Sequence, residues 1–376
     1  MFFLILYCYA GYPVFIWIIA RLFPRPVKKS PFLPDISILI AVYNEEDVIG
    51  NKIKNLLRLD YPPEKMEILI GSDGSTDRTN EIIKSAGSTK ITLIENATRR
   101  GKIATINELA SKAKGAILVF TDARQEFART ALAELTANFA DPSVGCVSGE
   151  LIFAEEEGAT AKGINLYWNY EKFIRGSESR VHSMLGATGA IYAVRKELFV
   201  PPPKTTILDD MYIPFRIILR GYRAILDGSA KAYDRIASTP KEEYRRKTRT
   251  LYGNYQIFSL LPQMFIPFKS PIALQLFSHK FLRVAAPFIL ILLFVFNWLM
   301  VDINFYFNFL TLQSLFYASA AAGFFLKEKK GGPLGLLAKT CYIPYVFCLL
   351  NFSALAGFWR FLTARQEITW DKAREK

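Results

Sequence analysis

Long runs without charged side chains lie at both ends of the chain, and they constrain its fold more than any other feature. Four runs of about 20 residues are nearly free of charge: 2–20, 281–300, 305–325 and 340–359. A length of about 20 apolar residues spans the hydrocarbon core of a bilayer. The pattern predicts a transmembrane anchor at 1–22 and about three transmembrane helices within 280–359.

The charges beside the first run predict how the chain is oriented. Four basic residues follow that run: Arg21, Arg25, Lys28 and Lys29. Lys and Arg are enriched in the cytoplasmic flanks of membrane helices. We therefore expect the N-terminus to lie outside and residues 30–260 to lie in the cytoplasm.

The C-terminal part is harder to orient. Three spans after residue 280 would leave the tail at 360–376 outside, but that tail is basic, which favours the inside. The side of the membrane on which the tail lies therefore stays open. The segment 261–278 is apolar but is interrupted by Pro267 and Pro271, so we expect it to lie in the membrane interface.

Between the membrane segments, short apolar runs alternate with stretches of helical periodicity. The apolar runs cover residues 35–42, 66–72, 90–95 and 116–122. The helical stretches cover residues 45–58, 76–86, 102–113 and 128–139. Continuous apolar strands joined by helices are typical of a parallel sheet covered on both faces. The region is therefore expected to form an α/β domain with mostly parallel strands.

Charged side chains follow the predicted strands. Glu45 and Asp73 come after the first and second runs, Asp122 ends the fourth, and Arg100 and Lys102 stand where a helix begins. Ligands bind outside the carboxyl ends of parallel strands, and helix N-termini with nearby cations suit phosphate. Carboxylates and phosphates share a site where a divalent cation neutralises them or where the acids bind hydroxyl groups. Each acid alone could instead be a turn or helix-capping residue, and Lys102 could be a solvated side chain.

Composition narrows the classes of function. The net charge of +13 is compatible with nucleic acid, anionic lipid or phosphorylated substrates as partners. The chain has only two histidines, which argues against a histidine-based zinc site and against a Ser/His/Asp triad.

An ordered set of motifs resembles a known family. "VYNEE", "SDGSTD", "GKIATIN", "FTDAR", "GATGAIYAVR" and "LDDMYIPFRIILRGYRA" follow one another between residues 33 and 260. In this order they resemble the membrane-embedded family 2 glycosyltransferases, such as the cellulose, hyaluronan and poly-N-acetylglucosamine synthases. The resemblance implies a Rossmann-like GT-A fold, a nucleotide-sugar donor expected to be UDP-linked, a Mg²⁺ or Mn²⁺ ion, and inversion at the anomeric carbon.

The resemblance also implies roles on the donor side. Tyr43 and Glu45 would lie against the base and ribose, Asp73 would hydrogen-bond the base, and Lys102 would lie near the diphosphate. Asp122 matches the first acid of the metal-binding Asp-X-Asp motif. The chain reads Asp-Ala-Arg at this point, so the second acid is missing and Arg124 is expected to neutralise pyrophosphate instead.

On the acceptor side, the resemblance assigns Asp210 as the catalytic base. Gly186, Thr188 and Gly189 would line the acceptor pocket, and Asp209, where the family usually has Glu, would lie beside them. Processive members carry Gln-X-X-Arg-Trp on a later helix.

The chain departs from that last motif. Arg249 fits its arginine and is expected to bind the donor, but Thr250 stands where the tryptophan would stack on the acceptor, and the glutamine is also absent. We therefore expect short products or single transfers more than long polymer, although Tyr252 or Tyr255 could replace the tryptophan.

These observations predict an inverting glycosyltransferase of the bacterial inner membrane with a cytoplasmic catalytic domain. It would extend a polysaccharide or glycolipid, with accessory export subunits as further candidate partners and no nucleic acid. One alternative is non-processive transfer to a polyprenyl phosphate or another lipid. A second is a catalytically silent scaffold that binds nucleotide-sugars, which the presence of both Asp122 and Asp210 disfavours.

Overall fold

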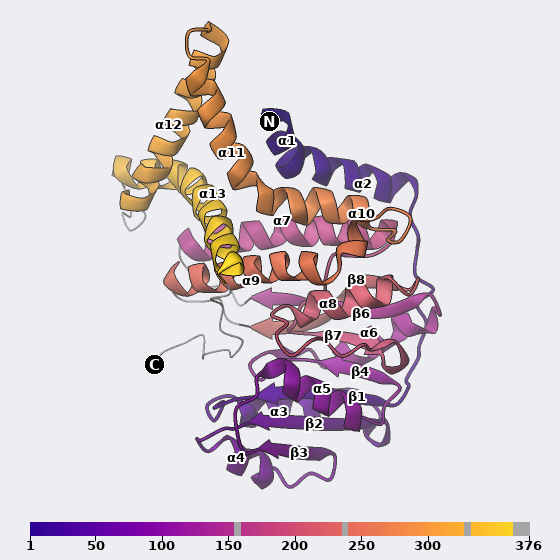
Figure 1. Cartoon of the computed structure of the whole chain (residues 1–376). Helices are drawn as coiled ribbons and strands as arrows, with labels where there is room; N and C mark the ends of the chain where they lie inside the picture. The colour runs from indigo at the N-terminus through magenta and orange to yellow at the C-terminus, as the bar shows by residue number, and fades with distance from the viewer. Residues whose placement is uncertain (154–158, 235–239, 327–331, 364–376) are drawn as a thin grey trace.

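The computed structural model describes residues 1–153, 159–234, 240–326 and 332–363. A curled sheet with its covering helices forms one part of the molecule, and apolar helices stand above it (Figure 1). The strands are β1 Ile36–Val42, β2 Met66–Asp73, β3 Ile91–Asn96, β4 Ile117–Phe120, β5 Glu126–Phe127, β6 Val144–Phe153, β7 Tyr192–Arg195 and β8 Arg223–Asp234.

The longer helices around the sheet are α3 Ile49–Leu57, α4 Thr79–Ser85, α5 Lys102–Lys112, α6 Ala131–Ala137, α7 Ala159–Val181, α8 Asp209–Ile218 and α9 Pro240–Leu260. The helices of the apolar part are α1 Phe2–Leu6, α2 Tyr12–Leu22, α10 Ala273–Gln275, α11 Leu282–Leu299, α12 Asn304–Leu326 and α13 Gly332–Leu362.

The sheet has the strand order β3-β2-β1-β4-β7-β6-β8-β5. The first four neighbours pair in parallel, as do β6 and β8, whereas β7 and β5 pair antiparallel to their neighbours. The prediction of a mostly parallel α/β sheet is therefore confirmed. The antiparallel β7 was not predicted, because its four residues are too short to give a pattern in the sequence.

Burial explains why the strands read as continuous apolar runs. Every residue of β1 is buried, with Ile38 and Ile40 packed on one face and Leu39 on the other. Helices α3 and α6 contribute to the first face, and α5 and α8 contribute to the second. Because both faces are covered, alternation of polar and apolar residues is lost.

Two predicted helices begin later than expected. Helix α3 begins at Ile49 rather than at residue 45, and α4 begins at Thr79 rather than at residue 76. The reason is that the residues before α3 and the residues before α4 bind one another. The Glu45 amide donates to Thr79 Oγ1 at 2.8 Å, and the Asn44 side chain accepts from the Thr76 amide at 2.8 Å. These contacts join the ends of β1 and β2.

Four helices are long and apolar enough to cross a membrane: Phe2–Leu22, Ala273–Leu299, Asn304–Leu326 and Thr340–Leu362. Three of them match the apolar runs closely, but the second begins eight residues before residue 281. The helix therefore takes up part of the segment expected in the interface, because Pro271 lies just ahead of the helix, where proline is tolerated. Pro344 lies inside α13 without ending it.

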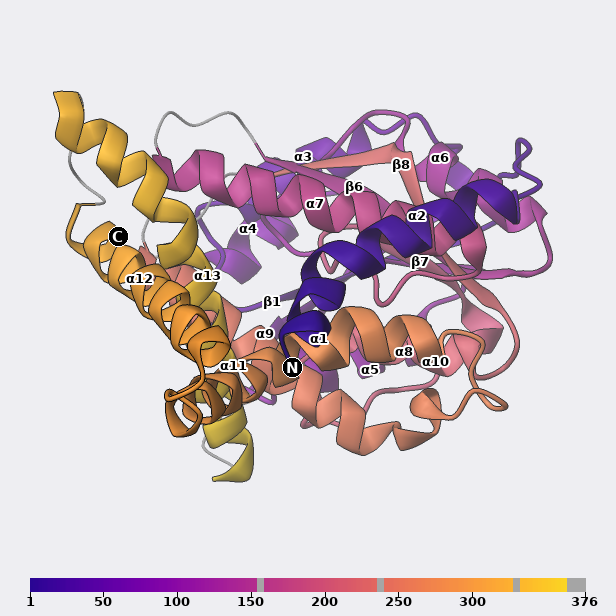
Figure 2. The same cartoon turned by 90° about the horizontal axis from the view of Figure 1, so that it is seen from above.

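The helices α7 and α9 connect the two parts. Seen from above, α2 lies along α7, and α11, α12 and α13 gather toward one end of the domain (Figure 2). The helix α9 packs against α13. The sheet domain is thus attached to the apolar helices at several separate places.

Candidate active site

The loop before α5 is held by Asp73. Its side chain is fully buried and accepts hydrogen bonds from the amides of Arg100 and Gly101, both at 2.8 Å, and from Thr105 Oγ1 at 3.2 Å. Gly101 has φ of 93°, which suits glycine. The Asp73 carboxylate therefore faces this loop and not an open crevice, and its contact with a base stays a prediction.

The two other residues expected near the base lie at the end of β1. The Tyr43 ring is covered by the guanidinium of Arg99, whose Cζ lies 4.0 Å from the ring centre. Glu45 belongs to the contact between the β1 and β2 ends described above. In the same turn, Asp77 accepts from the Thr79 amide at 3.0 Å and so forms an Asx turn just ahead of α4, whose N-cap residue is Arg78.

Lys102 joins the end of β4 to the start of α8. Its Nζ lies 2.9 Å from Asp122 Oδ1 and 3.9 Å from Asp209 Oδ1. Burial alone would lower the pKa of Lys102, but the charges of Asp122 and Asp209 outweigh it and raise the pKa. Burial likewise opposes ionisation of Asp122, yet Lys102 and Arg124 hold its pKa below the usual range. At neutral pH, the lysine is thus a cation and Asp122 a carboxylate.

The adjacent acids at the start of α8 have different partners. Asp209 is 5% exposed, and its Oδ2 lies 3.5 Å from the hydroxyl of the buried Tyr192. Asp210 is half-buried, and its Oδ2 accepts from the Gly189 amide at 3.2 Å. Burial, followed by the negative charge of Asp209, raises the pKa of Asp210 to about 6. A carboxylate with this pKa is suited to accept a proton near neutral pH.

The loop expected at the acceptor wraps around Asp210. The Ala187 amide donates to the Asp210 carbonyl at 2.6 Å, and the Thr188 amide donates to Ser148 Oγ at 3.0 Å. Gly186 has φ of 103°, and its carbonyl accepts from Arg175 at 3.0 Å. The structure therefore brings Gly186, Thr188, Gly189 and Asp209 together around Asp210, while their role in acceptor binding stays a prediction.

The position of Arg249 follows from its neighbours on α9. A Cβ on Gly253 would meet the Leu208 side chain at 2.5 Å, so this face of α9 lies against the residue before Asp209. Gln256 on the same face donates to the Thr205 carbonyl at 2.8 Å. Arg249 lies one helical turn before Gly253 and so shares that face. Arg124, in contrast, is an exposed residue in the turn that follows β4.

One buried cation of the site was missed in the sequence. Lys52 on α3 is 1% exposed, and its Nζ donates to Thr121 Oγ1 at 2.9 Å and to the Gln125 carbonyl at 2.6 Å. Burial lowers the pKa of Lys52 to about 7. The lysine holds the turn that carries Asp122. The sequence carried a signal for this burial, because Lys52 lies at the same helical spacing as the apolar residues Ile49, Ile53 and Leu56.

Comparison with known families gives two matches. Residues 37–200 match "Glycosyl transferase family 2", and residues 122–326, more than half of the chain, match "Glycosyl transferase family group 2". The chain belongs to the family 2 glycosyltransferases. The family resemblance in the sequence is thereby confirmed, and so is the expectation of an enzyme. The second match also extends into the apolar helices of this glycosyltransferase.

Individual relatives agree with this family. A poly-β-1,6-N-acetyl-D-glucosamine synthase of Staphylococcus aureus is 27% identical over 270 residues, which are 65% of this chain and 64% of that protein. The probable glycosyltransferase YdaM of Bacillus subtilis is 25% identical over 274 residues, 69% of this chain and 65% of that protein. The matches thus span just under two thirds of the length of these relatives.

A solved structure resembles this glycosyltransferase over almost its whole length. It is a mannosyltransferase from Pyrobaculum calidifontis, described in complex with GDP-mannose and Mn²⁺. The TM-score is 0.69 at 23% identity, and the match covers 96% of this chain and 97% of the other. The two proteins share a fold, so the expected combination of a GT-A domain with long apolar helices is confirmed.

Proposed function

We propose that this glycosyltransferase moves a sugar, with inversion, from a nucleotide-sugar to a saccharide acceptor at the membrane surface. The observation that carries the proposal is the position of Lys102, which contacts Asp122 on the donor side and Asp209 beside the proposed base, Asp210. A cation at that point lies between the leaving diphosphate and the acceptor. The acids on either side of it then have separate tasks.

On the donor side, Lys102 and Arg124 would bind the diphosphate, and Tyr43 and Glu45 would contact the base and ribose. No group of three or more His, Cys, Asp or Glu side chains in the described parts of the chain could hold a metal ion. The single strand-end carboxylate of Asp122 fits an ion that takes its remaining ligands from phosphate and water, as Mg²⁺ does. When bound, such an ion would neutralise charge on the departing diphosphate.

On the acceptor side, Asp210 would take the proton of the attacking hydroxyl. The acceptor oxygen forms a bond to the anomeric carbon while the bond from that carbon to the β-phosphate oxygen breaks. The proton passes to Asp210, and the nucleoside diphosphate leaves with the bonding electrons. Asp209, fixed by Lys102 and Tyr192, would keep the pKa of Asp210 raised and hold the start of α8 in place.

The relatives suggest two donors. The staphylococcal proteins are named as N-acetylglucosamine polymer synthases, which is compatible with the expected UDP-linked donor. The structure with the same fold was solved with GDP-mannose and Mn²⁺. We therefore place UDP-N-acetylglucosamine and GDP-mannose first among the donors to be tested, and both Mg²⁺ and Mn²⁺ as metals.

The aromatic residues of α9 favour short products or single transfers, including transfer to a lipid-linked acceptor. Thr250 cannot stack on a sugar. The Tyr255 hydroxyl donates to the Val284 carbonyl at 3.0 Å, and its ring packs against Phe358 of α13 at a centroid distance of 5.2 Å. Tyr252 packs against Phe361 of α13. Both rings pack against the apolar helices, so neither is free to stack on a sugar in place of the missing tryptophan.

The membrane arrangement completes the proposal. The basic flank after the first apolar helix favours a cytoplasmic catalytic domain at a bacterial inner membrane, with residues 30–260 as the GT-A domain. The membrane itself, a polysaccharide or lipid acceptor and accessory export subunits would be the partners. Most of the basic tail, residues 364–376, lies outside the described residues.

The test is a screen of nucleotide-sugars with the purified full chain. Release of nucleoside diphosphate is measured, and the mass of the product separates single transfer from polymer. One donor of the set should be consumed in the presence of a membrane extract that supplies acceptor. High-mass polymer made by this chain alone would contradict the expectation of short products.

Removal of the metal is expected to abolish turnover. A divalent ion contributes several kcal/mol of charge stabilisation in reactions of this kind. Excess chelator should stop release of nucleoside diphosphate, and Mg²⁺ or Mn²⁺ should restore it. Full turnover in excess chelator would remove the ion from the mechanism and leave Lys102 and Arg124 as the partners of the diphosphate.

A further inference from the structure

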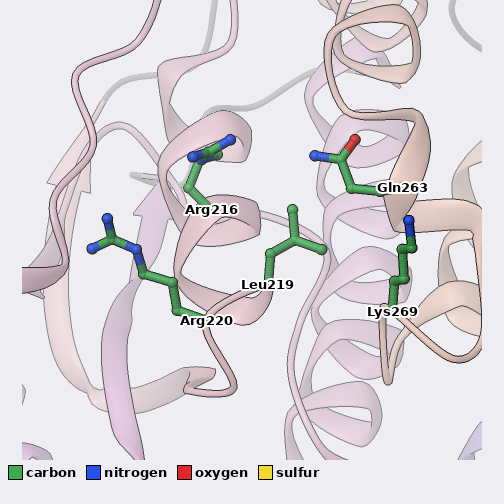
Figure 3. A pocket seen from close by; sticks show the side chains of 5 residues that line it. All are labelled: Arg216, Leu219, Arg220, Gln263 and Lys269. Atoms are coloured by element: carbon green, nitrogen blue, oxygen red, sulfur yellow. The ribbon is translucent and has the colours of Figure 1, made fainter.

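A pocket of about 360 Å³ lies at the opposite end of α8 from the catalytic acids. It is lined by Arg216, Leu219, Arg220, Gln263 and Lys269. Figure 3 shows the Arg216 guanidinium and the Gln263 amide pointing toward one another, with the Lys269 ammonium directed toward Gln263. The pocket thus joins the end of α8 to the segment between α9 and α10.

The charge of the pocket indicates an anionic ligand. Three of its five lining residues are cations, and none is acidic. Within the described residues, Arg216, Arg220 and Lys269 form no ion pair, although Arg220 donates to the Glu197 carbonyl at 3.3 Å. The C-terminal end of a helix favours one nearby cation, which would account for Arg216. It does not account for Lys269, which comes from a different segment.

The surroundings of the pocket indicate a membrane. Between Gln263 and Lys269, Phe268 is 100% exposed and Ile266 is 40% exposed. Leu274, at the beginning of the next apolar helix, is 58% exposed. Exposed aromatic and aliphatic side chains next to Lys and Arg are typical of segments that lie in the membrane interface. A soluble anion would leave Phe268 in water, whereas a lipid would supply acyl chains beside it.

We infer that this pocket binds the phosphate headgroup of an anionic membrane lipid. The phosphate would lie between Arg216 and Lys269, with Gln263 as a neutral hydrogen-bond donor and with Phe268 and Ile266 among the acyl chains. The site would fix the segment 262–269 at the membrane surface. It would also hold the last turn of α8, where Arg216 lies six residues after Asp210, beside the membrane. The inference rests on membrane insertion of Ala273–Leu299 and not on any particular sugar donor.

The test uses the purified full chain in neutral detergent. Phosphatidylglycerol and phosphatidylcholine of the same chain length are titrated separately, and the rise in melting temperature gives an apparent affinity. We expect a rise with phosphatidylglycerol and a much smaller one with phosphatidylcholine. Each cation near an anionic lipid contributes about fivefold in affinity, so the double variant Arg216→Gln/Lys269→Gln should bind about 30-fold more weakly.

A matched control comes from a second cation-lined pocket. Lys54 and Arg58 line a pocket of about 560 Å³ that also contains Glu126. The variant Lys54→Gln/Arg58→Gln removes the same charge but should keep the response to phosphatidylglycerol. The single variant Lys269→Gln changes an exposed residue, so it tests the site if Arg216→Gln impairs folding.

Three results would overturn the inference. One is an unchanged response to phosphatidylglycerol in the double variant or in Lys269→Gln. Another is an equal rise in melting temperature with inorganic phosphate at the same concentration, which would identify a site for soluble anions. A loss in the control variant equal to that in the double variant would show a general charge effect and would also contradict a defined site.

Discussion

Two charged clusters contain similar side chains in different surroundings. The active-site cluster consists of Lys102, Asp122, Asp209 and Asp210. The second cluster lies beneath the apolar helices. In the second cluster, Glu178 Oε1 accepts from the Tyr12 hydroxyl at 2.7 Å and lies 2.8 Å from His279 Nδ1. Glu171 contacts His279 Nε2 at 3.3 Å and forms an ion pair with Arg283. These residues come from α2, α7 and the helix at Ala273–Leu299.

The difference lies in what the acids face. Glu178 and His279 are fully buried, and the acids of this cluster pair with protein groups, through Glu178 Oε1 and through both oxygens of Glu171. In the active site, the Asp122 side chain is 37% exposed and Asp210 is half-buried. Closed networks of charge cost desolvation and hold elements together, whereas partly open ones keep charge available for a ligand. The active-site cluster is thus suited to chemistry. The second cluster is suited to joining the catalytic domain to the apolar helices.

The largest effect is expected from Asp210→Asn. Loss of a general base costs about 10²- to 10⁴-fold in turnover. Binding of the donor nucleotide, measured by calorimetry, should stay near that of the unaltered protein, because the proposed role of Asp210 is on the acceptor side. Asp209→Asn is the matched control and should cost less. An inactive Asp209→Asn beside an active Asp210→Asn would reverse the assignment, and near-normal turnover in both would place the base elsewhere.

Glu171→Gln should lower stability and leave turnover nearly unchanged, the opposite of what is expected for Asp210→Asn. It removes the negative charge that faces Arg283 and His279, and breaking a buried pair costs about 3–5 kcal/mol of stability. The melting temperature in detergent should therefore fall clearly, while turnover per folded molecule stays close to normal. Asp210→Asn should show the reverse, a nearly unchanged melting temperature with low turnover. Unchanged stability in Glu171→Gln would mean that the closed cluster does not hold the two parts together.

The pH dependence sharpens the role of the two acids at α8. A base with a pKa of about 6 works only when it is deprotonated, so kcat/KM should be level above pH 6 and fall about tenfold for each unit below it. The negative charge of Asp209 contributes to that raised pKa. In Asp209→Asn, the acid limb should therefore move to lower pH. If kcat/KM of Asp209→Asn falls over the same pH range as in the unaltered protein, Asp209 does not act through Asp210.

The smallest effect is expected from Lys52→Met. The variant leaves the Gln125 carbonyl without its buried donor, which costs about 1–3 kcal/mol, and it loosens the turn that carries Asp122. Donor affinity and melting temperature should both decrease modestly. Lys54→Met, on the exposed side of the same helix, is the control and should change neither. Equal effects of the two variants would mean that the buried lysine does not support the site.

Much of the fold was predictable because its signals are local. The apolar lengths of the four spans and the runs that become β1, β2, β3 and β4 are properties of neighbouring residues. The strand ends placed Lys102 and Asp122 at one edge of the sheet, and the motifs named Asp210. The delayed starts of α3 and α4 could not be predicted in the same way, since they depend on contacts between residues 44–46 and 76–79 across two strands.

The sequence by itself determined the α/β pattern, the apolar helices and the residue types of the site, because periodicity and apolar length act over a few residues. Only the tertiary structure decided which acids are enclosed and which stay partly open. Tyr12, Glu178 and His279 meet across separations of 166 and 101 residues. The direction of Asp73 and the burial of Lys52 were decided in the same way, by loops and strands that come from elsewhere in the chain. Burial sets the cost of a charge, and burial is a property of the packed molecule.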